Sequence, residues 1–207
     1  GDACQENTRA LDEVFAGERE GHYYSRYGNP STESFERGVA ALEGAVGAVA
    51  FASGMAAIHG ALLTAGVRSG HTVLASRDMY GVTLQLLNTL MADAGVRTVS
   101  VDATDLDAVR AALEARRPRA VLVETLSNPL LRVADVPALA DAAHGARAAL
   151  IVDSTFTSPY LIRPHEHGAD FVVHSATKYL GGHGDALGGV VSTDEITTAA
   201  AAATRKT

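Results

Sequence analysis

Short apolar runs alternate with stretches rich in alanine and leucine from residue 48 onward, and this alternation constrains the fold more than any other feature. The apolar runs are typical of strands that are buried on both faces. They cover residues 48–52, 72–75, 98–101, 120–123, 149–152 and 171–173. Helical spacing is found between them, in residues 55–65, 83–94, 106–115 and 136–143. This repeated β-α order predicts an α/β fold, with a mostly parallel sheet and helices on both of its faces.

The two ends of the chain depart from this alternation. Residues 1–47 do not follow it, and residues 21–31 predict a loop dense in polar rings and turn residues. Residues 188–192 predict a further short strand, and the alanine run 199–203 predicts a helix. We therefore divide the chain into an N-terminal arm, residues 1–47, and a large domain, residues 48–207. Both ends are abrupt, as expected for part of a longer polypeptide.

Composition excludes several classes of protein. The 207 residues are 47% hydrophobic and 20% charged, which suits one globular domain. A net charge of −7 disfavours binding to nucleic acid or to an anionic membrane surface. The single cysteine, Cys4, has no partner for an internal disulfide, and no stretch has the length of a membrane span or the layout of a signal peptide. The chain is expected to be a cytoplasmic enzyme or binding protein.

Lysine occurs only at Lys178 and Lys206, against fifteen arginines. Lys178 follows the apolar run 171–173 and precedes a glycine-rich stretch, so it is expected at the carboxyl end of a strand, where α/β proteins bind ligands. A desolvated amine at that place is a nucleophile toward carbonyl groups, as in Schiff bases with pyridoxal phosphate or keto substrates. We therefore expect Lys178 to be buried and reactive.

A carboxylate and a glycine turn also follow predicted strands. Asp153 ends the run 149–152 and could pair with a protonated ring nitrogen, although a helix N-cap is an equally simple role. Ser53, Gly54 and Met55 lie between a strand and a helix, where backbone N–H groups could cradle a phosphate. An ordinary tight turn is the alternative. The Walker pattern and the Gly-x-Gly-x-x-Gly pattern are both missing, which disfavours a nucleotide.

Four further polar residues could bind a ligand, and each also has a simpler structural explanation. Ser175 and Thr177 flank Lys178 and could bind the same phosphate, or could be surface turn residues. Tyr80 could stack on a planar cofactor and transfer protons, or could serve packing alone. Asn128 could reach a ring hydroxyl, or could belong to a simple Asn-Pro turn. One cofactor explains why all these residues follow strands, whereas the alternatives share no common cause.

Two other kinds of site find little support. His165 and His167 suggest a metal pair, but no third ligand at suitable spacing stands nearby, so no metal is expected. The Gly-x-Ser-x-Gly pattern of a hydrolase is also missing.

The chain resembles the Cys/Met-metabolism, or trans-sulfuration, family of pyridoxal-phosphate (PLP) enzymes. The resemblance runs from about residue 21 to residue 192, with the motifs in the right order and spacing. The motifs are Tyr24-Ser-Arg-Tyr-Gly-Asn-Pro-Ser31, Ala52-Ser-Gly-Met55, Tyr80-Gly81, Glu124-Thr-Leu-Ser-Asn-Pro129, Asp153-Ser-Thr-Phe-Thr-Ser-Pro-Tyr160 and Ser175-Ala-Thr-Lys-Tyr-Leu-Gly-Gly-His-Gly-Asp185. The family includes cystathionine γ-synthase, cystathionine γ-lyase, methionine γ-lyase and the O-acylhomoserine sulfhydrylases.

This resemblance implies a catalytic role for three residues. Lys178 would hold PLP as a Schiff base and shuttle protons, Asp153 would pair with the pyridine nitrogen, and Tyr80 would stack on the ring and assist the leaving group. The resemblance also implies a wider set of cofactor-binding residues around them, namely Ser53, Gly54, Met55, Asn128, Thr155, Ser175 and Thr177.

The resemblance also implies a fold and an assembly. The fold is the large domain of the fold-type I PLP enzymes, which in relatives is followed by a C-terminal domain that this chain lacks. The arginine that binds the substrate carboxylate belongs to that domain. Tyr24 and Arg26 match a pair that reaches the neighbouring subunit's phosphate. A homo-oligomer is therefore implied, as a dimer or a dimer of dimers.

The choice of reaction depends on fewer signals. Methionine γ-lyases typically have a cysteine two positions after the stacking tyrosine, where this chain has Val82, and the Asn29-Pro30 pair resembles the γ-acting members. We expect γ-elimination on cystathionine or methionine, with γ-replacement as the alternative. A catalytically silent PLP-fold protein and a nicotinamide-dependent oxidoreductase are the more remote possibilities.

Overall fold

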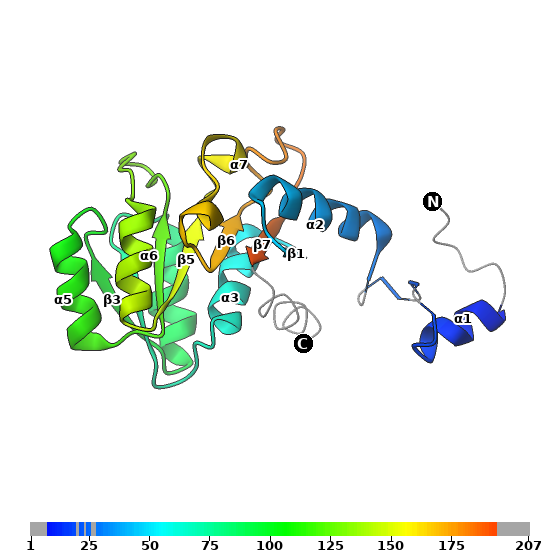
Figure 1. Cartoon of the computed structure of the whole chain (residues 1–207), viewed down its shortest axis with the longest axis horizontal. Coiled ribbons are helices and arrows are strands. Elements are labelled where there is room, and N and C mark those ends of the chain that lie inside the picture. Colours follow the sequence, from blue (N-terminus) through cyan, green and yellow to red (C-terminus); the bar gives the residue numbers. More distant parts are fainter. Residues whose placement is uncertain (1–7, 20, 23, 26–27, 194–207) are drawn as a thin grey trace.

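A seven-stranded sheet forms the centre of the protein (Figure 1). The computed structural model describes residues 8–19, 21–22, 24–25 and 28–193. The strand order is β1-β7-β6-β5-β4-β2-β3. The strands are β1 (Gly47–Phe51), β2 (Thr72–Ser76), β3 (Arg97–Val101), β4 (Ala120–Glu124), β5 (Ala149–Asp153), β6 (Phe171–His174) and β7 (Gly189–Thr193). The strands β3, β2, β4, β5 and β6 are parallel, and β7 runs antiparallel to both β1 and β6. The predicted mostly parallel α/β sheet is confirmed.

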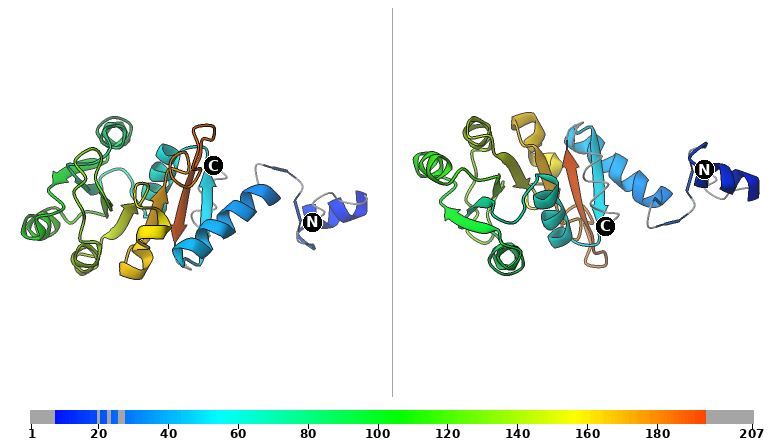
Figure 2. Two further views of the ribbon diagram at one scale, coloured as in Figure 1. Left: turned by 90° about the horizontal axis from the view of Figure 1, so that it is seen from above. Right: turned by 90° about the horizontal axis from the view of Figure 1, so that it is seen from below.

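Helices cover both faces of the sheet, as the two views in Figure 2 show. They are α3 (Gly54–Thr64), α4 (Gly81–Leu86) with the π-helical η1 (Leu87–Met91), α5 (Leu106–Arg116) and α6 (Val136–Gly145). The short α7 (Ser158–Leu161) and the 3₁₀ segment η2 (Pro164–His167) lie between β5 and β6 in the chain. Val73 and Leu122 point to the α3 side, whereas Leu74 and Val121 point to the side of α5 and α6. This alternation follows from the period of two along a strand, and it buries the sheet on both faces.

One predicted helix differs in form from the expectation. Residues 83–94 were expected to form a single α-helix, but α4 begins at Gly81 and continues as η1 from Leu87. The Thr89 hydroxyl donates to the Gln85 carbonyl at 2.7 Å within this stretch. Such side-chain bonding to the preceding turn competes with the regular helical bonds and accompanies the widened turn.

The N-terminal region contains helices that the sequence pattern did not predict. These are α1 (Thr8–Phe15), which lies apart from the sheet in Figure 1, and α2 (Pro30–Glu43). The Asn29 side chain accepts from the N–H groups of Ser31 and Thr32, and Pro30 begins α2. The predicted loop 21–31 is therefore wrong at its end, because Asn29-Pro30 is a helix start.

The helix α2 is anchored to the sheet by two carboxylates. Glu36 Oε1 accepts from Ala50 N–H of the edge strand β1 at 2.7 Å. Glu43, fully buried, lies 2.5 Å from His174 Nε2 at the end of β6. The predicted helix 199–203 lies outside the described residues. No helix within the described residues is long and apolar enough to cross a membrane.

Candidate active site

A cavity of about 860 Å³ opens at the carboxyl ends of β4, β5 and β6, beside the N-terminus of α3. Parallel strands bring their carboxyl ends to one edge of a sheet, which is where α/β proteins bind ligands. Ten of the residues selected from the sequence line this cavity: Ser53, Gly54, Met55, Tyr80, Asn128, Asp153, Thr155, Ser175, Thr177 and Lys178.

The N-terminus of α3 forms one wall of the cavity. Ser53 is the N-cap, and its Oγ accepts from Ala56 N–H at 3.2 Å. The N–H groups of Gly54 and Met55 belong to the first turn, where a helix offers them no internal acceptor. A Cβ at Gly54 would lie 2.7 Å from the Ser175 Cβ, so only glycine lets the end of β6 approach this closely. The wall combines free N–H donors with the positive end of a helix dipole.

Asp153 lies at the end of β5 with its carboxylate held on one side. Thr155 donates to Asp153 Oδ1 twice, from its N–H at 3.0 Å and from its hydroxyl at 2.5 Å. Ser175 N–H in turn donates to Thr155 Oγ1 at 2.8 Å. Burial raises the pKa of Asp153, and the bonds from Thr155 oppose that shift. Asp153 is not a helix N-cap, because α7 begins only at Ser158.

Lys178 lines the cavity but is not buried. Its side chain is exposed in this chain, so the expectation of a desolvated amine is wrong for the structure described. The physical reason is that Lys178 lies in a turn, with Gly182 N–H bonded to its carbonyl, beside an exposed glycine-rich loop. The neighbouring Thr177 hydroxyl donates to the Gly188 carbonyl at 3.2 Å and accepts from Gly188 N–H at 3.1 Å.

Glu124, to which the sequence assigned no role, connects two of the predicted residues. Its Oε1 accepts from Tyr80 N–H at 2.8 Å, and its Oε2 accepts from Asn128 N–H at 3.0 Å. Only 8% of Glu124 is exposed. Burial raises its pKa to about 7, and the nearby Asp153 adds to the shift against these two bonds. Like Asp153, Glu124 is a carboxylate that follows a predicted buried strand. The same pattern could therefore have identified Glu124 as a candidate site residue from the sequence.

Two simpler alternatives can be compared with the geometry. Tyr80 is 45% exposed at the cavity wall, so it is not buried in the core. Asn128 does lie in an Asn-Pro turn, whose peptide bond to Pro129 is cis, and it lines the cavity as well. Phe156 and Tyr179, which the sequence did not suggest, also line the cavity and meet edge to face at 6.1 Å.

The remaining predicted residues lie elsewhere. Tyr24 is 54% exposed and is not part of this cavity wall, and Arg26 lies outside the described residues. His165 Nδ1 donates to the Ala169 carbonyl at 3.0 Å, and its Nε2 lies 2.9 Å from Ser192 Oγ. Within the described part of the chain, no group of three His, Cys, Asp or Glu side chains could hold a metal ion.

Comparison with known proteins assigns the chain to a family. The model of the Cys/Met metabolism PLP-dependent enzymes matches residues 4–206. The chain belongs to this family. O-succinylhomoserine sulfhydrylase of Pseudomonas aeruginosa is 46% identical over 178 residues, covering 86% of this chain and 44% of that protein. L-methionine γ-lyase of Pseudomonas putida is 44% identical over 177 residues, with coverages of 86% and 44%.

Solved structures of family members share the fold. A crystal structure from Campylobacter jejuni that contains N′-pyridoxyl-lysine-5′-monophosphate matches with a TM-score of 0.83 and 32% identity. It covers 93% of this chain and 47% of the other. The chain spans less than half the length of the curated relatives it matches.

The cavity of this Cys/Met-metabolism chain fits PLP, the cofactor of the family. A phosphate matches the free N–H groups at the start of α3, where Gly54 lets Ser175 approach the helix closely. Asp153 Oδ2 accepts no hydrogen bond from the described residues, which leaves it for a ring N–H. Lys178 supplies an amine at the same cavity. The donor set therefore suits a phosphorylated, nitrogen-containing aldehyde.

Proposed function

We propose that this chain is the cofactor-binding part of a PLP-dependent enzyme that catalyses γ-elimination on a sulfur amino acid, cystathionine or methionine. The observation that carries the proposal is the meeting of Lys178, Asp153 and the α3 N-terminus at one cavity. These three features come from separate segments of the sequence. A covalent amine, a ring-nitrogen partner and a phosphate cradle are the three needs of PLP.

The phosphate end of the site is assigned to α3 and to the segment after β6. The N–H groups of Gly54 and Met55 would bind phosphate oxygens directly. The hydroxyls of Ser53, Ser175 and Thr177 would add bonds. For Ser53 and Thr177 this requires sharing or rotating hydroxyls that now bond Ala56 N–H and Gly188. Such charge-assisted bonds hold the cofactor by its most strongly charged group.

The ring end is assigned to Asp153, Tyr80 and Asn128. Asp153, oriented by Thr155, would hold the pyridine nitrogen in its protonated form. Tyr80 would stack on the ring, and Asn128 would bind a ring or substrate oxygen. When bound, PLP supplies an electron sink for negative charge that develops at the substrate α carbon. Lys178 would attach the cofactor and then move protons at the α and β carbons.

The assembly and location are proposed on the same basis. Residues 1–47 would form an arm that brings Tyr24 and Arg26 to the phosphate of a neighbouring subunit, and residues 48–207 would form the PLP-binding domain. The enzyme would be a homo-oligomer with shared sites, and it would work in the cytoplasm. A bidentate arginine on phosphate is a physically strong contact.

γ-Replacement, as in cystathionine γ-synthase or a sulfhydrylase, is the second candidate. It is supported by the O-succinylhomoserine sulfhydrylase of Pseudomonas aeruginosa at 46% identity, against 44% for the methionine γ-lyase of Pseudomonas putida. The chain also has Val82 at the start of α4, at the position where typical methionine γ-lyases have a cysteine.

A product assay separates the two reactions. The purified full-length protein with PLP is given cystathionine, methionine or an O-acylhomoserine, each with and without a thiol. We expect 2-oxobutyrate from the sulfur amino acids. Faster formation of a thioether from the acylated substrate would instead assign γ-replacement.

The cofactor assignment has its own test. Wild-type protein should show the absorbance of a lysine-bound PLP, and Lys178→Ala should lack that absorbance and all turnover. Lys178→Ala protein that retained both would refute the assignment. PLP binding without turnover on any substrate would favour a catalytically silent family member.

A further inference from the structure

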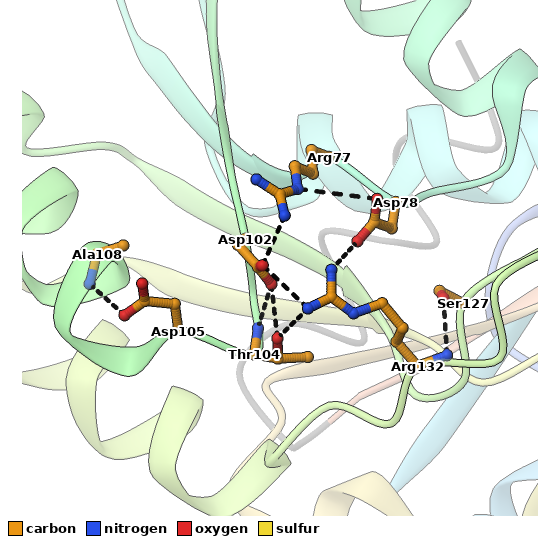
Figure 3. Close-up of polar contacts among 8 residues, drawn as sticks. All are labelled: Arg77, Asp78, Asp102, Thr104, Asp105, Ala108, Ser127 and Arg132. Carbon is orange, nitrogen blue, oxygen red and sulfur yellow. Dashed lines mark hydrogen bonds and ion pairs between the residues drawn. The ribbon is translucent and has the colours of Figure 1, made fainter.

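The loops that carry Tyr80 and Asn128 are joined outside the cavity as well as inside it. The first loop follows β2 and the second follows β4. Inside, the Glu124 carboxylate accepts from the N–H groups of both residues. Outside, a cluster of arginine and aspartate side chains lies over the same two loops (Figure 3).

Arg132 is the centre of this outer cluster. Its Nη1 lies 2.6 Å from Asp78 Oδ2, and its Nη2 lies 3.0 Å from Asp102 Oδ2. Nη2 also donates to the Thr104 hydroxyl at 2.6 Å. One guanidinium therefore connects the segments that follow β2, β3 and β4, as Figure 3 shows. A planar fork of donors can hold several acceptors in a fixed arrangement, which a single ammonium group cannot do.

Each end of this contact is close to a residue of the proposed site. Asp78 precedes Tyr80 by two residues. Arg132 closes a turn with Ser127, whose N–H donates to Arg132 O at 3.0 Å and whose Oγ accepts from Arg132 N–H at 3.0 Å. Asn128 is the next residue in that turn. A shift of the guanidinium would therefore be passed to Tyr80 on one side and to Asn128 on the other.

Asp102 and Arg132 keep their charges near neutral pH. Hydrogen bonds from Thr104 and the contact with Arg132 lower the pKa of Asp102 to about 2, against a smaller opposing effect of burial. Hydrogen bonds to Asp78 and Asp102 raise the pKa of Arg132. The carboxylates are also partly shielded, since the side chains of Asp78 and Asp102 are each 17% exposed. The contact between Arg132 and Asp102 is therefore an ion pair at neutral pH and does not act as a pH switch.

We propose that Arg132 is a positioning residue, which holds Asp78 and Asp102 and thereby sets how Tyr80 and Asn128 stand across the cavity. One attachment at Glu124 would let the two loops pivot about that point, whereas a second attachment removes this freedom. The inference rests on the proposed function, because it gives Tyr80 and Asn128 their roles toward the cofactor. Misplacement by about 1 Å costs on the order of 100-fold in rate.

Arg132→Gln tests the proposal, and Arg77→Gln is its matched control. Arg77 belongs to the same cluster, with Nη2 at 2.7 Å from Asp102 and Nε at 3.9 Å from Asp78. It lies on the same segment as Asp78, so it does not join the Tyr80 loop to the Asn128 loop. Each variant removes one positive charge from the same cluster, so the two variants are matched in charge.

The two readouts are turnover and the circular dichroism of the absorbance band of bound PLP, in the full-length protein. Arg132→Gln should lower kcat about 10- to 100-fold, with a smaller change in KM, because the reacting groups are misplaced rather than lost. The dichroism should change as the Tyr80 ring moves against the cofactor. Arg77→Gln should stay within about twofold of wild type in kcat. Equal behaviour of the two variants would overturn the proposal.

Hydrogen exchange provides a readout that does not depend on turnover. In the cofactor-free protein, Arg132→Gln should speed exchange both in the peptide that contains Tyr80 and in the peptide that contains Asn128. Arg77→Gln should speed exchange in neither peptide. Unchanged exchange in both peptides would also contradict the proposal. If wild type failed to bind PLP, the proposed function would fall, and this exchange experiment would still decide whether Arg132 couples the loops.

Arg132→Lys covers the case in which Arg132→Gln does not fold. A lysine keeps the charge but cannot hold Asp78, Asp102 and Thr104 at once. We expect an intermediate kcat, altered dichroism and a wild-type melting temperature. Wild-type kcat and dichroism in this variant would refute the positioning role.

Discussion

Glu124 is a buried carboxyl group in the cavity wall whose charge the fold must accommodate. Its pKa is raised from an ordinary 4.5 to about 7, chiefly by burial. Below pH 4.5 the group is protonated in both the folded and unfolded protein. As the pH rises to about 7, the unfolded chain releases the proton first, so the folded state loses stability.

Replacing Glu124 by glutamine should therefore remove a pH dependence of stability. Relative to Glu124→Gln, the free energy of unfolding of cofactor-free wild type should fall by about 3 kcal/mol between pH 4.5 and 7 and change little above. Denaturant titrations at several pH values measure this difference. Glu114→Gln, at an exposed position of α5, is the control and should show no such trend. A difference that rose with pH would contradict the assigned direction.

Asp153 differs from Glu124 in having one oxygen bonded twice by Thr155 and the other left for a ligand. Asp153→Asn should still allow Lys178 to hold PLP but should lower kcat at least about 100-fold, since a neutral amide no longer keeps the ring nitrogen protonated. Absorbance of bound PLP and steady-state turnover measure the two effects separately. Near-normal turnover would refute the role given to Asp153.

At the scale of whole elements, a buried pair fastens α2 to the centre of the sheet. Glu43 and His174 are 0% and 1% exposed, and their contact joins residues 131 positions apart. Within the described residues, Glu43 Oε2 and His174 Nδ1 have no hydrogen-bond partner, so each side chain depends on the other. A buried polar group that loses its partner is costly.

Glu43→Ala should therefore lower the free energy of unfolding by about 3–5 kcal/mol, because His174 is left buried and unpaired. Chemical denaturation measures the change. Glu33→Ala, on the same helix, removes a carboxylate that is 37% exposed and should cost less than about 1 kcal/mol. The double variant Glu43→Leu with His174→Phe should regain much of the loss, and failure to regain any would show that the pair matters for another reason.

For the molecule as a whole, we expect active sites that are shared between subunits. Arg26→Ala and Lys178→Ala should each be inactive alone. If Arg26 serves a neighbouring subunit, a mixed dimer has one site with both residues intact. A 1:1 mixture that exchanges subunits should then regain about a quarter of wild-type activity, since half the dimers are mixed and each has one intact site. Activity that stays at background after exchange, checked by tagged subunits, would exclude the shared site.

The sequence predicted the sheet well because local patterns encode buried strands. Each predicted strand, for example residues 149–152 against β5 at Ala149–Asp153, is within one or two residues of the observed element. The helix α2 was missed altogether, because its start, Asn29-Pro30, is typical of both a turn and a helix N-terminus. Ten predicted site residues line one cavity, because each follows a strand whose carboxyl end lies at the same edge of the sheet.

The amino-acid sequence by itself determined the α/β alternation, the motif set and hence the PLP-dependent family, since these depend on residues near one another in the chain. Tertiary structure alone decided that Lys178 is exposed in this chain, that Glu124 receives the N–H groups of Tyr80 and Asn128, and that Arg132 joins three loops. These contacts connect residues up to 54 positions apart. They arise only when crossover connections place β2, β3 and β4 side by side, and no local periodicity records which distant side chains will then meet.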